Sequence, residues 1–230
     1  MPADVLLIDP SQEPLPEEIR GYFHETYDAL TGLGFEHVAV MALPSLLPNV
    51  RTILALYRND STLDLAMSSF ILTIGGAKSV RARYVEFYRR YSDNVVVQTN
   101  NSPELGSFPA REGAHTTQFW EIQDVARLYH LHQFLAEKFR RSGHAVNRLD
   151  AQYQGDPVRY VAEDVLDRSF GDQIETGYLA RCAEGYRPTA KGALIMTWQE
   201  LWPIKPMRRA KRRRQAAEVL REFGIAGRDL

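Results

Sequence analysis

Residues 81–91 read RARYVEFYRRY, an alternation of tyrosine, valine and phenylalanine with arginine and glutamate. Side chains of a β-strand point alternately to its two faces, so this period predicts an extended segment that includes Tyr84, Phe87 and Tyr88. The charged members predict a sheet with one face in contact with water. A helical period fits the same residues in part, and the structure decides between the two.

Further strands are predicted on both sides of this segment. A loop with Pro44, Pro48 and Asn49 separates two of them, Gly75-Gly76 ends a third, and the turn 92–94 precedes a fourth. No helical pattern interrupts them, which predicts an antiparallel meander of five or six strands. The predicted ranges besides 81–91 are 37–43, 50–58, 65–74, 95–99 and 116–122.

Two amphipathic helices flank the predicted sheet. The first begins near Pro16 and stops at Gly32 and Gly34. The second is capped by Asp124 and runs to about Arg141. Its apolar face contains Val125, Leu128, His132, Leu135 and Phe139. We therefore expect an α+β fold in which residues 1–143 form an antiparallel sheet with a helix before and after it.

The C-terminal third has a different composition. Residues 144–155 have the composition of a linker, and Asp156-Pro157 predicts the start of a helix that Gly171 ends. Residues 177–189 predict a hairpin around Glu184-Gly185, and two further helices are split by Pro203 and Pro206. We expect residues 156–230 to form a smaller helical region with one hairpin.

Composition bounds the class of protein. The 230 residues are 44% hydrophobic, which is typical of a globular chain. One cysteine, Cys182, excludes an internal disulfide and a cysteine-based zinc site. The first ten residues, MPADVLLIDP, lack the basic and long apolar regions of a secretory signal, so we expect a cytoplasmic protein, with peripheral attachment to the inner membrane face as one possibility.

The stretch KGALIMTWQELWPIKPMRRAKRRRQAAEVLREF at 191–223 points to a partner. Leu194, Trp198, Leu201 and Trp202 form one helical stripe, and a basic cluster follows it. Without that cluster the formal charge of the chain changes from −1 to −8, so its positive charge is local. The basic residues are Lys205, Arg208, Arg209, Lys211, Arg212, Arg213 and Arg214.

Tryptophans beside arginines are typical of an interfacial membrane element, and we expect these residues to bind an anionic lipid surface. Two other interpretations stay open. The stripe could pack on the body while 207–223 forms an ordinary surface helix, or the basic helix could bind nucleic acid. Exposure of Trp198 and Trp202 would favour the membrane interpretation.

Three polar residues are candidates for ligand binding in a cleft between the sheet and its helices. Asn100 follows a strand, where asparagine more often forms a turn. His130 and His132 are two residues apart and cannot chelate one metal from one helix, so His132 is interpreted as a core residue, which His115 could approach. We expect no metal and no cofactor, and a cleft that holds a small apolar ligand.

Motifs for common reactions are lacking. The sequence contains no Gly-x-Ser-x-Gly, Walker or Gly-x-Gly-x-x-Gly pattern, and 75–79 is interpreted as a hairpin turn. The acids of 163–172 fit a solvated helix face better than a catalytic carboxylate pair. A non-enzymatic binding protein is the first interpretation, and an enzyme with a polar cleft using Asn100, His115 or His132 is an alternative.

Two resemblances accompany these patterns. Residues 177–179 (GYL) and 186–192 (YRPTAKG) resemble the wing of winged-helix DNA-binding domains. In that family a helix enters the major groove, but the matching segment 157–170 carries Glu163, Asp164 and Asp167, which phosphates would repel. The C-terminal order of a tryptophan-rich helix, Leu-Trp-Pro and arginines is also similar to uncharacterised bacterial proteins, a resemblance that implies no activity.

Overall fold

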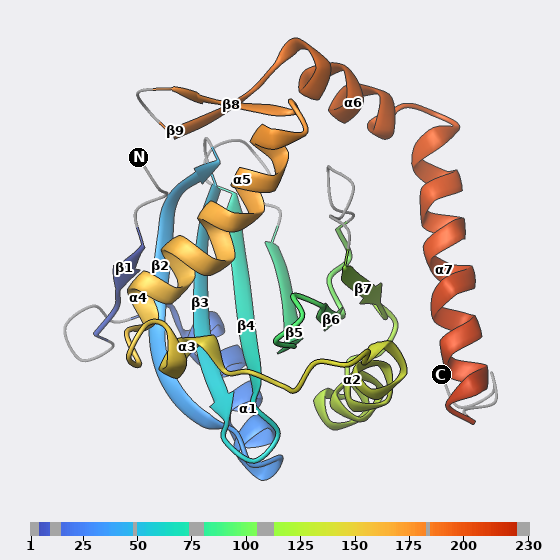
Figure 1. Cartoon of the computed structure of the whole chain (residues 1–230). Helices are drawn as coiled ribbons and strands as arrows, with labels where there is room; N and C mark the ends of the chain where they lie inside the picture. The colour runs from blue at the N-terminus through green and yellow to red at the C-terminus, as the bar shows by residue number, and fades with distance from the viewer. Residues whose placement is uncertain are drawn as a thin grey trace.

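The computed structural model describes residues 5–9, 15–47, 50–73, 81–104, 113–182 and 185–224. Within this part of the chain, seven strands form one sheet in the order β1-β2-β3-β4-β5-β6-β7 (Figure 1). The α+β class is confirmed. The strands are β1 (Leu6–Leu7), β2 (Glu36–Leu47), β3 (Val50–Asn59), β4 (Asp64–Thr73), β5 (Arg81–Arg90), β6 (Val96–Asn100) and β7 (Ala114–Gln118).

Helices precede and follow this sheet, and a small second sheet pairs β8 (Leu179–Cys182) with β9 (Gly185–Pro188). That pair confirms the predicted hairpin. The helices are α1 (Glu17–Gly32), α2 (Val125–Phe139), α3 (Arg148–Ala151), α4 (Pro157–Arg159), the π-helix η1 (Tyr160–Asp167), α5 (Arg168–Glu175), α6 (Ala190–Glu200) and α7 (Ile204–Glu222).

The stretch 81–91 is extended, as its alternation predicted. Tyr84, Phe87 and Tyr88 lie in β5, which pairs antiparallel with both β4 and β6. The predicted antiparallel meander was wrong for the last pair of strands, because β6 and β7 are parallel. A parallel pair requires the chain to return to the same end of the sheet between the strands. Residues 105–112 of this connection lie outside the described residues.

One face of the sheet is covered by α1 and α2. From α1, Ile19, Tyr22, Phe23 and Leu30 are buried, and from α2 Leu128 and Leu135 are fully buried. They pack on alternate residues of the strands, which point to this face. The sheet contributes Ala42, Ile53, Ala55, Tyr57, Ala66, Phe70, Val85, Phe87 and Val97 to this core.

The other face is covered over β2–β4 by α3, α4 and η1, which cross in front of these strands in Figure 1. Met41, Leu56 and Met67 of the sheet pack there with Tyr160 and Val161. Residues of the ranges 1–143 and 156–230 therefore pack together in the core on each face of the sheet. Glu86 and Arg89 were expected to face water, but each is 7% exposed, so this prediction was wrong. Hydrogen-bonded networks, described below, compensate for the burial of these charged side chains.

Several predicted boundaries in the helical region were wrong. The predicted linker 144–155 contains α3, whose cap is the side chain of Asn147. The helix that Asp156 opens continues through Gly171 to Glu175, because its π-helical and α-helical turns maintain the hydrogen bonding. Pro206 lies in the first turn of α7, where a helix tolerates the missing N–H.

One predicted boundary in the sheet was wrong as well. Pro44, predicted in a loop, lies in β2 at an irregularity of its pairing with β3.

Three predicted turns lie wholly or partly outside the described residues. Residues 75–79 lie outside the described residues, as do Pro48 and Asn49. In the hairpin, Glu184 also lies outside them, although both of its strands are described.

Candidate functional site

The turn between α6 and α7 carries a group of exposed apolar side chains. Trp198 is 57% exposed and Trp202 is 86% exposed. Leu194, Leu201 and Met207 are exposed as well. We call these five residues the apolar elbow. Soluble proteins expose single apolar residues routinely, but several large ones within fourteen positions indicate a contact surface.

Helices α6 and α7 form an arm that carries the apolar elbow. The first end of this arm is attached to the hairpin. Thr189 caps α6, its hydroxyl oxygen accepting a hydrogen bond from the Gly192 N–H at 3.0 Å. Gly192 lies directly against the backbone of Tyr178, and the Lys191 ammonium lies 4.6 Å from the centre of the Tyr178 ring. The start of α6 is therefore fixed, and its later residues extend away from the sheet (Figure 1).

The second end is attached through the last turns of α7. Val219 and Leu220 are buried in the core that α1 and α2 share with the sheet. The Phe223 ring meets the Phe134 ring of α2 with centroids 5.5 Å apart. Figure 1 shows α7 running beside β7. With both ends attached to the body, the elbow is held at the edge of the molecule.

The seven predicted basic residues divide into two groups. Arg212 is half-buried and donates from Nη1 to the Thr116 carbonyl oxygen at 3.2 Å, and burial lowers its pKa. Arg213 lies 5.6 Å from the centre of the Trp120 ring and 3.7 Å from a carboxylate oxygen of Glu121. These two arginines therefore face the body, although Arg213 stays largely open to solvent.

The other five basic residues lie along α7 between Lys205 and Arg214. Arg209, Lys211 and Arg214 are exposed, while Lys205 pairs with Glu200 and Arg208 is half-buried. We call Arg209, Lys211 and Arg214 the basic flank. The basic flank follows the apolar elbow in sequence, and Met207 of the elbow lies in α7 together with the flank.

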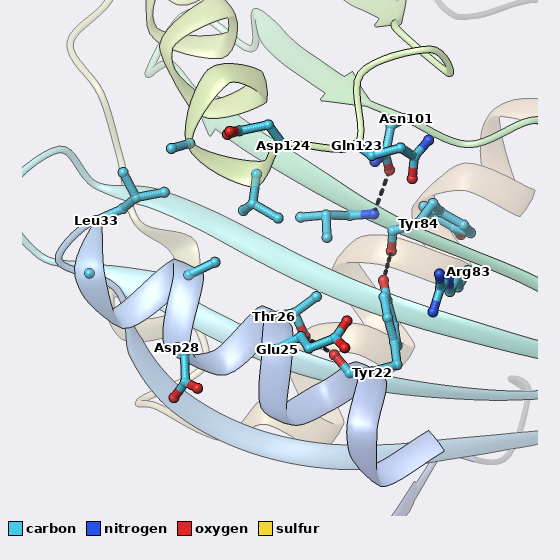
Figure 2. Close-up of a pocket in the computed structure, with 15 residues that line it drawn as sticks. Tyr22, Glu25, Thr26, Asp28, Leu33, Arg83, Tyr84, Asn101, Gln123 and Asp124 are labelled. Carbon is cyan, nitrogen blue, oxygen red and sulfur yellow. Dashed lines mark hydrogen bonds between the residues drawn. The ribbon is translucent and has the colours of Figure 1, made fainter. Parts of the chain in front are cut away.

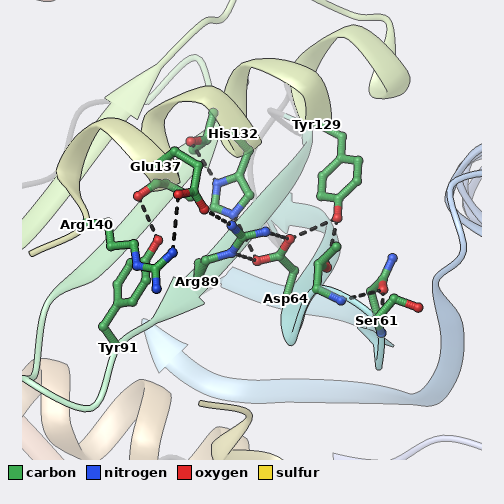
Figure 3. Close-up of polar contacts among 12 residues, drawn as sticks. Ser61, Asp64, Arg89, Tyr91, Tyr129, His132, Glu137 and Arg140 are labelled. Atoms are coloured by element: carbon green, nitrogen blue, oxygen red, sulfur yellow. Dashed lines mark hydrogen bonds and ion pairs between the residues drawn. The ribbon is translucent and has the colours of Figure 1, made fainter. Parts of the chain in front are cut away.

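His132 belongs to a buried charge network between β4, β5 and α2 (Figure 3). Arg89 donates from Nε and Nη2 to the two oxygens of Asp64, each at 2.7 Å. Tyr129 donates to Asp64 Oδ2 at 2.9 Å, and His132 Nε2 lies 3.5 Å from Asp64 Oδ1. Its Nδ1 lies 3.1 Å from the Thr99 hydroxyl, so both ring nitrogens of His132 face protein groups.

The electrostatics of this network favour a fixed charge pair and a neutral imidazole. Burial alone would raise the pKa of Asp64, but the close contact with His132 and the hydrogen bonds from Arg89 lower it to about 2. Burial lowers the pKa of His132 below its ordinary value. With no exposed surface, His132 lies in the core, as the interpretation of the helix stripe expected.

Asn100 and His115 lie apart from His132. Thr99 contacts His132, and successive strand residues point to opposite faces, so Asn100 faces the other side of the sheet. His115 stacks on the Phe139 ring with centroids 4.1 Å apart. The structure does not bring the three predicted ligand residues into one cleft.

Asn100 instead takes part in a network around Glu86. Its Nδ2 donates to Glu86 Oε1 at 3.0 Å, and Gln98 and Tyr88 donate to the same carboxyl group. Burial raises the pKa of Glu86 despite these hydrogen bonds, because they come from neutral donors. These hydrogen bonds connect β5 to β6. None of the hydrogen bonds just described gives Glu86 a positively charged partner.

A separate cleft lies between α1 and the start of α2, with β5 as its floor (Figure 2). Its volume is about 630 Å³, within the range of small-molecule sites. Leu33 and Val125 line it together with three carboxylates, those of Glu25, Asp28 and Asp124. A cleft next to the sheet was expected, but its rim is acidic and none of the predicted ligand residues lines it.

The comparisons with known proteins are negative. No family model, curated protein or solved structure matches the chain. Among the helices of the described ranges, none combines the length and apolar character needed to cross a membrane. Within the same residues, no three His, Cys, Asp or Glu side chains are grouped as a metal site would require.

The sequence analysis missed two groups of buried charges. Asp64 and Arg89 form the first, and Arg90 with Asp164, Arg148 and Arg168 forms the second. Asp164 and Arg168 are four residues apart in continuous helical turns, but the other members come from separate strands and helices, and no local spacing connects those. A surplus of arginine in the strand 81–91 was the available signal, and it was interpreted as a water-facing pattern.

Proposed function

We propose that the chain binds an anionic membrane surface through the apolar elbow and the basic flank. The observation that supports this most is the exposure of Trp198 and Trp202 on an arm attached to the body at both ends. Tryptophan is enriched where an apolar environment meets water, as at the headgroup level of a bilayer.

The apolar term dominates the expected binding energy. Each large apolar side chain that leaves water contributes roughly 1.5–3 kcal/mol. Each basic residue near an anionic leaflet contributes about 1 kcal/mol. Five exposed apolar side chains therefore outweigh the three basic ones, even when part of the gain offsets the entropy of association. Added salt screens the smaller term and leaves the larger one.

Nucleic-acid binding explains fewer of these features. Affinity for phosphates comes from basic side chains, and Arg212 and Arg213 already face protein groups. A duplex would also leave Trp198, Trp202 and Leu194 in water. A membrane surface uses both the basic flank and the apolar elbow.

Vesicle co-sedimentation tests this proposal. We expect binding to vesicles containing phosphatidylglycerol, weaker but measurable binding to pure phosphatidylcholine, and retention of most binding when the salt concentration is raised. The Trp198→Ala/Trp202→Ala variant should lose binding and unfold at the same temperature as the wild type, because both rings are exposed. Steeply salt-dependent DNA binding without vesicle binding would contradict the proposal, as would self-association through these rings seen by light scattering.

A further inference from the structure

Three arginines from three elements converge on one buried carboxylate. Arg90 of β5 donates from Nη2 to Asp164 Oδ2 at 2.7 Å. Arg148 of α3 donates to Asp164 Oδ1 at 3.0 Å, and the Arg168 guanidinium lies 3.6 Å from the same oxygen. The Asp164 side chain is 1% exposed, which places this cluster inside the protein.

The cluster has more positive than negative charge. Three guanidinium groups and one carboxylate give a formal excess of two positive charges. Nearby acids have other partners, since Glu163 pairs with Arg159, Asp167 accepts from Tyr186, and Asp150 pairs with Arg58. Burial lowers the pKa of Arg90, and the charges of Arg148 and Arg168 lower it further, in keeping with this excess.

One donor atom of an arginine beside the cavity is buried and has no acceptor. Nη1 of Arg90 makes no hydrogen bond within the part of the chain that the structure describes, whereas Nη1 of Arg168 has its ion pair with Asp164 at 3.6 Å. A buried charged donor without an acceptor is costly, so native proteins almost always compensate one. An acceptor is therefore expected beside Nη1 of Arg90, and the excess positive charge of the cluster favours an anion over a neutral acceptor.

A small cavity lies beside these arginines. Its volume is about 10 Å³, and Arg90 and Arg148 line it together with Tyr88 and Tyr160. The remaining walls are the apolar side chains of Leu63, Leu65, Val96 and Val146. The Tyr88 hydroxyl donates to Glu86, and Arg148 donates from Nη1 to Asp164 and from Nη2 to Asn94. Nη1 of Arg90 is therefore the guanidinium nitrogen of the cavity lining that has no acceptor among the described residues.

We propose that this cavity is a binding site for a monatomic anion, with chloride as the physiological ligand. A space of this size holds one water-sized particle, and small side-chain movements would admit a chloride ion. Phosphate, sulfate and carboxylates need more room and a polar wall opposite the arginines. Apolar walls suit a weakly hydrated ion with a single charge. Asp164 comes from a π-helix, a rare geometry found mostly at functional sites.

Halide-dependent stability tests this site. Thermal unfolding is measured in sodium chloride and in sodium gluconate at equal ionic strength. Chloride should raise Tm with a saturable dose response, because it binds the folded state. Val96→Ile places an extra methyl group in the cavity while preserving the apolar core, and its apparent chloride Kd should rise at least about tenfold. Arg159→Met, which removes an exposed arginine outside the cavity lining, should respond as the wild type does.

A crystal grown or soaked with bromide provides a second readout that does not depend on a variant. The anomalous difference map should show a peak between the Arg90 and Arg148 guanidinium groups. The proposal is overturned if the wild type shows no bromide peak there. Equal chloride responses of the wild type and Val96→Ile would also overturn it, since the stabilisation would then arise elsewhere.

Discussion

Arg89 holds both carboxylate oxygens of Asp64, with Nε and Nη2 each 2.7 Å from an oxygen. The pair joins β4 to β5, and Tyr129 connects it to α2. Without Asp64, the buried Arg89 would keep one longer contact, from Nη1 to the largely exposed Glu137 at 3.3 Å. Removing one member of a buried pair typically costs about 3–5 kcal/mol. We therefore predict that Asp64→Asn lowers the free energy of unfolding by about this amount in urea titrations.

An exposed ion pair on the second face is the matched control. Arg159 and Glu163 lie 3.3 Å apart with both side chains about half exposed to solvent. Such pairs contribute about 0–1 kcal/mol. Glu163→Gln should therefore change stability little. A comparable loss for Glu163→Gln and Asp64→Asn would contradict the assigned role of the buried pair.

The same carboxylate predicts a pH dependence. Folding lowers the pKa of Asp64 from 3.8 to about 2, so the folded state holds this proton less tightly. The resulting stability is present above pH 4 and is lost as the pH falls from about 4 toward 2, a change of roughly 2–3 kcal/mol. The stability difference between the wild type and Asp64→Asn should shrink over this interval. A stability difference that stays constant from pH 6 to pH 2.5 would show that ionisation of Asp64 is not the source of this pH-dependent stability.

Two glycines predict opposite effects of the same substitution. A Cβ on Gly192 would lie 1.9 Å from the Tyr178 carbonyl oxygen, whereas a Cβ on Gly171 meets no atom within 4 Å. Gly192→Ala should therefore displace the start of α6 and cost about 1–3 kcal/mol. Gly171→Ala should stabilise the helix by about 0.5–1 kcal/mol. Thermal unfolding measures both, and hydrogen exchange in α6 should increase for Gly192→Ala alone.

The division of the basic residues predicts which charges bind lipid. Reversal of Arg209, Lys211 and Arg214 to glutamate should weaken binding to anionic vesicles at least about 100-fold at low salt. Reversal of Arg20, Arg141 and Arg181, which are also exposed, changes the net charge equally and should have a smaller effect. Equal losses in flotation assays would mean that the net charge, and not the basic flank, controls binding.

Patterns within single segments predicted much of the fold. The alternation of 81–91 placed Tyr84 and Phe87 in a strand, and the stripe of α2 placed Leu128 and His132 in the core. Such periods report which side of an element is buried. They do not report what covers a face, and for this reason Glu86 and Arg89 were expected to face water.

Contacts between distant segments could not be predicted in the same way. Asp64 and Arg89 are 25 residues apart, and Arg90 and Asp164 are 74 apart. Their pairing depends on strand register and on the helices that cross the second face. Exposure of Trp198 and Trp202 was likewise left open, because an apolar stripe packs equally well on a protein core and on a lipid surface.

Fluorescence quenching by brominated lipids tests the membrane proposal most directly. Two single-tryptophan proteins are compared on vesicles containing brominated phosphatidylglycerol, one with Trp202 alone and one with Trp120 alone, the other tryptophans being replaced by phenylalanine. Trp120 lies under the Arg213 guanidinium and away from the apolar elbow. We predict strong quenching and a blue shift for Trp202, with Trp120 nearly unchanged. Unquenched Trp202 on vesicles that bind the protein, or no binding to vesicles, would contradict the proposal.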